Sequence, residues 1–61
     1  MDWHQEVWAE ALWVEQNKGG DGPRFIAERI ADLALKGDEA GIARWKRIAA
    51  AFDDLRSGRL Q

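Results

Sequence analysis

The only side chain whose charge changes near neutral pH is that of His4, the single histidine of the chain. Its neighbours Asp2 and Glu6 could orient the imidazole for general acid–base catalysis. However, the chain has no cysteine, and Ser57 is its only residue with an aliphatic hydroxyl group. A lone histidine without a nucleophile or a second ligand is typical of a solvated surface. The sequence therefore predicts no catalytic residue and no enzyme.

Acidic residues are plentiful, but their spacing does not form a metal cage. Asp53 and Asp54 are adjacent, so on a helix their side chains diverge by about 100°. Glu6 and Glu10 form an ordinary exposed pair one helical turn apart. We therefore predict neither a metal site nor a bound cofactor.

A glycine-rich segment, Gly19, Gly20, Asp21 and Gly22, precedes a predicted helix. Helix N-termini and glycine backbones bind anions, so one hypothesis is that this segment forms a phosphate-binding loop. The spacing of a Walker motif is absent, no strand precedes the segment, and Asp21 would repel a phosphate. The prediction is a flexible connection between two helices.

The composition is that of one folded domain over residues 1–61. Hydrophobic residues make up 46% of the chain and charged residues 33%, and the net charge is −2. Such a small charge provides no field to steer the protein onto nucleic acid. The longest apolar run, residues 48–52, is far shorter than the roughly 20 residues of a membrane span. With no cysteine and no secretory pattern, we expect a bacterial cytoplasmic protein.

Three amphipathic helices are predicted, at about residues 2–17, 23–36 and 38–56, and they predict a small all-α three-helix bundle. Both connections are short, which favours antiparallel neighbours, although a steep angle at the second connection stays open. The expected core residues recur at helical spacing: Trp3, Val7, Trp8, Ala11, Leu12, Val14, Ile26, Ile30, Leu33, Ile42, Trp45, Ile48, Ala49, Phe52 and Leu55.

Local signals set the predicted helix ends. Asp2 and Asp38 are the expected N-caps, and Pro23 fits the first position of the second helix. Gly37 is the expected left-handed residue that ends the second helix. Leu35 should then pack across this Schellman turn.

Trp13 and Phe25 are the aromatic residues that do not lie on the predicted apolar faces of the helices. Trp13 would lie among Glu6, Glu10 and Asn17, away from the buried face. Single exposed apolar side chains are common, and Phe25 could fold onto the first helix. However, both residues flank the same glycine segment, and tryptophan is enriched among residues that dominate interface energetics. We predict that Trp13 and Phe25 contact a protein partner or a second copy of the chain.

The alternative function is DNA binding by a helix-turn-helix formed by the second and third helices. Arg44, Lys46 and Arg47 would then lie near the start of the recognition helix. Against this, the turn is shorter than usual, and Asp38 and Glu39 would approach the DNA phosphates. Nucleic acid is therefore the less favoured partner.

Several segments resemble a group of short uncharacterised alphaproteobacterial proteins. They are the stretch from Ile26 to Leu33, the junction from Gly37 to Gly41, the run from Trp45 to Ile48, and the start from Trp8 to Leu12. The resemblance covers most of the chain and rests on capping, turn and core residues. It implies a small helical cytosolic protein with a domain of unknown function, and no activity.

Overall fold

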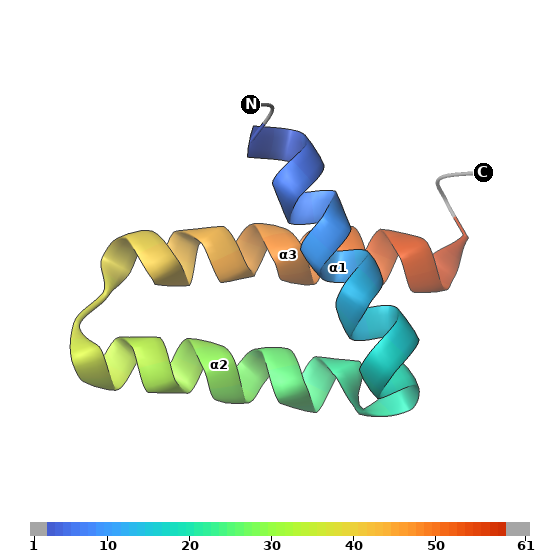
Figure 1. Cartoon of the computed structure of the whole chain (residues 1–61). Helices are drawn as coiled ribbons and strands as arrows, with labels where there is room; N and C mark the ends of the chain where they lie inside the picture. The colour runs from blue at the N-terminus through green and yellow to red at the C-terminus, as the bar shows by residue number, and fades with distance from the viewer. Residues whose placement is uncertain (1–2, 59–61) are drawn as a thin grey trace.

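The computed structural model describes residues 3–58, and the side chains of residues 5–58. These residues form α1 (Trp3–Lys18), the short 3-10 helix η1 (Gly19–Asp21), α2 (Gly22–Lys36) and α3 (Glu39–Ser57), with no strand among them (Figure 1). The all-α prediction is confirmed, and each predicted helix end lies within one residue of the observed one. The roles predicted for Asp2 and for the side chains of Trp3 and His4 lie outside the described residues.

The predicted three-helix bundle is wrong. No non-helical residue separates α1, η1 and α2, so residues 3–58 contain two unbroken helical segments, 3–36 and 39–57. Of these elements, α2 and α3 run side by side in opposite directions as a hairpin, whereas α1 lies steeply across α3 (Figure 1). Beyond their junction at η1, α1 and α2 share few contacts. Because α1 crosses the hairpin, the helices do not share the common axis of a bundle.

The centre of the core is α3, which packs against both other helices. Trp45, Ile48 and Phe52 of α3 are buried, which confirms the strong apolar period predicted for this segment. Ile48 and Val14 of α1 are the largest side chains with almost no exposed surface. The described core consists of eight buried residues: Val7, Ala11, Val14, Ile26, Trp45, Ile48, Ala51 and Phe52. Six further side chains are partly buried against it: Trp8, Phe25, Ile30, Leu33, Ala49 and Leu55.

The junction of α2 and α3 has the predicted caps. Gly37 adopts left-handed geometry, with φ 72°. Its N–H donates to the carbonyl oxygen of Ala34 at 3.1 Å, and the N–H of Asp38 donates to that of Leu33 at 2.9 Å, which together form a Schellman motif. The Asp38 carboxylate accepts a hydrogen bond from the N–H of Gly41 at 2.8 Å and so caps α3. Two residues therefore suffice to end one helix and begin the next.

The glycine segment is not the flexible connection that its composition predicts. Gly19 is left-handed, with φ 53°, and the segment then continues as one turn of 3-10 helix into α2. Gly22 has α-helical angles and is buried, because it lies directly under the Phe52 ring of α3. A Cβ atom at this position would collide with that ring. Gly22 thus serves close packing rather than chain reversal.

Ion pairs between described residues connect α1 to α3 across the surface. Arg44 lies 3.5 Å from Glu6, and Arg56 lies 3.2 Å from Glu15. All four side chains are partly exposed, so each pair contributes at most about 1 kcal/mol. Within residues 3–58, no helix is both long enough and apolar enough to cross a membrane.

Candidate partner-binding surface

Three aromatic rings, one from each α-helix, form a row that runs from the surface to the core. The ring centroids of Trp13 and Phe25 are 6.0 Å apart with the ring planes tilted by 47°. Phe25 meets Trp45 edge to face, also at 6.0 Å. Trp45 is buried, Phe25 is half-buried, and Trp13 is 46% exposed. We call these three side chains the aromatic row; its outer end presents an indole to solvent.

Local structure places both outer members of the row. Trp13 lies in the last turns of α1, where Asn17 Nδ2 donates to the Trp13 carbonyl oxygen at 2.8 Å. Phe25 lies in the first turn of α2, directly after η1 has redirected the chain. The compact η1 turn therefore brings Trp13 and Phe25 into contact, and Phe25 folds onto α1 as the sequence allowed. Such edge-to-face and tilted pairs contribute about 0.5 to 1.5 kcal/mol beyond the area they bury.

Two cations lie over rings of this row. Lys18 Nζ is 4.9 Å from the centroid of Phe25, and the Arg29 guanidinium carbon is 5.3 Å from that of Trp45. Among the described residues, neither cation is within salt-bridge distance of a carboxylate. Cation–π contacts satisfy these charges only in part, since an exposed one contributes about 0.5 to 1 kcal/mol. A cation therefore lies against each of the two inner rings of the aromatic row, Phe25 and Trp45.

Two leucines are more exposed than the apolar pattern predicts. Leu12 was expected in the core but is 46% exposed, because α1 crosses α3 so that its buried side chains among the described residues are Val7, Ala11 and Val14. It lines an apolar hollow of about 370 Å³ together with Trp8 and Leu55. Leu35 does not pack across the Schellman turn and is 87% exposed.

The residues of the DNA-binding alternative all lie on α3, and two of them are engaged in contacts within the chain. The Arg44 guanidinium is paired with Glu6 of α1. Arg47 donates to the carbonyl oxygen of Ala43 in its own helix at 3.5 Å. Lys46 is exposed on α3. DNA binding remains a prediction that no contact among these residues favours.

Of the residues considered for catalysis, Asp2 and the side chain of His4 lie outside the described part of the chain. Ser57 Oγ donates to the Asp54 carbonyl oxygen at 3.1 Å in the last turn of α3, where both backbone and side chain are near solvent. Asp53 and Asp54 diverge around α3, as predicted. Within the described part of the chain, no three histidine, cysteine or acidic side chains lie close enough to hold a metal ion.

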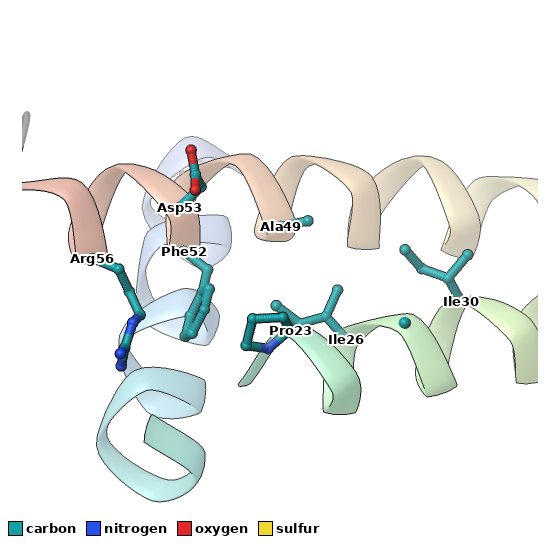
Figure 2. A pocket seen from close by; sticks show the side chains of 8 residues that line it. Pro23, Ile26, Ile30, Ala49, Phe52, Asp53 and Arg56 are labelled. Atoms are coloured by element: carbon teal, nitrogen blue, oxygen red, sulfur yellow. The ribbon is translucent and has the colours of Figure 1, made fainter. Parts of the chain in front are cut away.

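A groove opens between α2 and α3, with a volume of about 360 Å³. Figure 2 shows it with α1 behind α3, whereas α1 lies in front of α3 in Figure 1, so the groove is on the face of the hairpin opposite to α1. Its lining comes from both helices: Pro23, Ile26, Ala27 and Ile30 of α2, and Ala49, Phe52, Asp53 and Arg56 of α3. We call it the hairpin groove.

These observations define a small all-α protein, a helical hairpin of α2 and α3 crossed by α1, with an aromatic row at one surface and an open groove at another. Neither surface holds a set of catalytic side chains among the described residues. The chain belongs to the family of unknown function DUF6961, whose model matches residues 3–59. No curated protein and no solved structure matches the chain. The resemblance to an uncharacterised family is thereby confirmed, and its alphaproteobacterial origin stays a prediction.

Proposed function

We propose that this protein is a non-catalytic interaction module that binds a protein partner through Trp13 and the half-buried Phe25 beside it. The observation that carries the proposal is the aromatic row. An indole that is 46% exposed is held by Phe25, so it loses little conformational freedom when a partner covers it. Rigid aromatic anchors of this kind dominate the binding energy of many interfaces.

The partner that fits this surface presents an apolar side chain next to a carboxylate. The apolar group would cover the Trp13 indole, and the carboxylate would face Lys18 or Arg29. Both cations lie against rings, without an acidic partner among the described residues, so a partner's carboxylate need not displace an existing ion pair. Charge complementarity of this kind adds specificity and accelerates association.

Site-specific photocrosslinking tests the proposal in the cells that produce the protein. A benzophenone amino acid replaces Trp13 in one variant and Leu12 in the other. Leu12 is a matched control because it is also 46% exposed and adjacent on α1, but it has no part in the aromatic row. We expect a discrete protein adduct from position 13 and none of that mass from position 12. Equal adducts from both positions, or none from position 13, would refute the proposal.

Charge reversal tests the acidic character of the partner. Lys18→Glu should weaken the position 13 adduct at least several-fold, because it replaces attraction by repulsion. Lys36→Glu is the matched control, since Lys18 and Lys36 each lie in the last turn of an α-helix and meet the same helix dipole. An adduct that is unchanged by Lys18→Glu would reject an acidic partner and leave only the apolar contact.

We also propose a bacterial cytoplasmic setting. Its support is the sequence resemblance and the absence of cysteine from the chain. Recovery of the native protein in a periplasmic or membrane fraction would contradict it.

A further inference from the structure

The hairpin groove is a second apolar surface, independent of the aromatic row. Its lining includes the large apolar side chains of Ile26, Ile30 and Phe52 and the small residues Ala27 and Ala49. Figure 2 shows the Phe52 ring pointing toward α2 and Asp53 pointing away from it, at the α3 rim. No other element of residues 3–58 covers this face, because α1 packs on the opposite one.

The outer side of α3 beside this groove carries an ordered set of charges. Lys46 and Asp53 are seven residues apart, so they lie on the same side of the helix, two turns from each other. Ala49 and Ala50 lie between them and present only methyl groups. Lys46, Ala50 and Asp53 are all exposed. Along the helix axis the order is therefore positive, small, negative.

This charge order is complementary to the same order read in the opposite direction along the helix. If two α3 helices lie antiparallel, with a two-fold axis between Ala49 and Ala50, Lys46 of each copy faces Asp53 of the other. The two alanines at the axis permit the close approach that packed helices require, at about 8 to 10 Å between axes. A two-fold interface demands such self-complementarity, because the same patch is used on both copies.

We propose that a second copy of this chain packs against the open face of the hairpin. The two hairpins then form a layered pair, with α3 against α3 and the hairpin grooves facing each other. α1 stays on the outside of each copy, so the aromatic row remains accessible. The dimer would also stabilise a chain that has only eight buried core residues among those described and no cysteine for a disulfide.

Sedimentation equilibrium over a concentration series tests this proposal with a charge-swap design. We expect the wild type to form a concentration-dependent dimer. Lys46→Glu and Asp53→Lys should each raise the dimer Kd by about 10- to 100-fold, because each converts two ion pairs into two like-charge pairs. The double variant, K46E with D53K, should restore the dimer, since both pairs are regained with reversed sign.

Two alanine positions provide a steric test. Ala50→Glu puts a carboxylate at the two-fold axis and should abolish the dimer. Ala9→Glu is the control, because Ala9 is exposed and belongs to α1, which packs on the opposite face of the hairpin. Circular dichroism checks that all variants keep the helical content of the wild type.

The outcomes separate this inference from the proposed function. A wild type that is monomeric up to about 1 mM, or a double variant that stays monomeric, would overturn the dimer and leave the aromatic row untouched. Trp13→Glu should leave the dimer intact. If Trp13→Glu dissociates the dimer and Ala50→Glu does not, the copies associate through the aromatic row, which contradicts this inference and makes the partner of Trp13 a second copy.

Discussion

Gly22→Ala should destabilise the protein, although replacing glycine by alanine within a helix normally has the opposite effect. Gly22 has helical angles, φ −54° and ψ −48°, so alanine fits the backbone at this position. Intrinsic helix propensity then favours alanine by up to about 1 kcal/mol. The reason for the expected loss is the Phe52 ring, which occupies the space that the new methyl group would need.

The magnitude follows from where the ring can go. Phe52 is only 4% exposed, and Arg56 lies over its ring at 5.8 Å, so the ring can yield mainly toward the hairpin groove. Exposing about 40 to 80 Å² of its surface costs about 1 to 2 kcal/mol at 25 cal/mol per Å². Insertion of a methyl group into a packed core costs about 1 to 3 kcal/mol in general. After subtraction of the helix propensity, we expect a net loss of about 0.5 to 2 kcal/mol.

Thermal unfolding followed by circular dichroism, at one fixed protein concentration, measures this loss. For a domain of this size, a loss of that magnitude lowers Tm by about 2 to 16 °C. Gly20→Ala is the matched control, because a Cβ atom at Gly20 meets nothing within 4 Å and its φ is not positive. That variant should raise stability by about 0.4 to 1 kcal/mol. The two substitutions therefore differ in sign, although they lie two residues apart.

A double-mutant cycle identifies the cause. Phe52→Leu removes the ring, so Gly22→Ala should cost much less in that background than in the wild type. A Gly22→Ala protein that is as stable as Gly20→Ala would refute the packing of Gly22 against Phe52. An equal cost of Gly22→Ala in both backgrounds would show that the loss arises in the backbone instead.

Further substitutions test the caps and the core. Asp38→Ala should cost about 1 kcal/mol through loss of the α3 cap, and Asp38→Asn should retain most of that stability; equal urea midpoints for both variants would contradict the role of the side-chain acceptor. Gly37→Ala should cost about 1 to 2 kcal/mol, because alanine is strained at φ 72°, and an unchanged midpoint would argue against the Schellman turn. Trp45→Ala should cost about 3 to 5 kcal/mol and abolish cooperative melting, whereas Leu35→Ala, at a side chain that is 87% exposed, should leave Tm almost unchanged. Retained cooperative melting in Trp45→Ala would show that α3 is not the centre of the core.

The helix ends were predictable because their signals are local. Pro23 near the start of α2, Gly37 at its end and Asp38 before α3 each act within four residues of backbone, so their effect does not depend on the rest of the fold. The buried face of α3 was predictable for a similar reason, since a strong helical period shows which side must leave water. The exposure of Trp13 follows from the same periodicity in α1.

The arrangement of the helices was not predictable in this way. The apolar faces fix which residues are buried, but the crossing angle depends on which ridges and grooves meet. Leu12 lies on the predicted buried face of α1, and only the steep crossing over α3 decides that Val14 is covered while Leu12 remains exposed. The candidate site was not predictable for the same reason, because Lys18 and Arg29 reach the aromatic row through contacts between helices.

The glycine segment shows most clearly which features follow from the local sequence and which depend on tertiary packing. From the sequence, its three glycines indicate a flexible connection, because glycine disfavours helix interiors. In the fold, the segment is helical, and Gly22 is required because the Phe52 ring, thirty residues later, leaves no room for a side chain. The sequence by itself determined the helices and their ends, through interactions within a few residues. The tertiary structure alone decided how α1 crosses the hairpin and which surfaces stay open, because those depend on close packing between residues far apart in the chain.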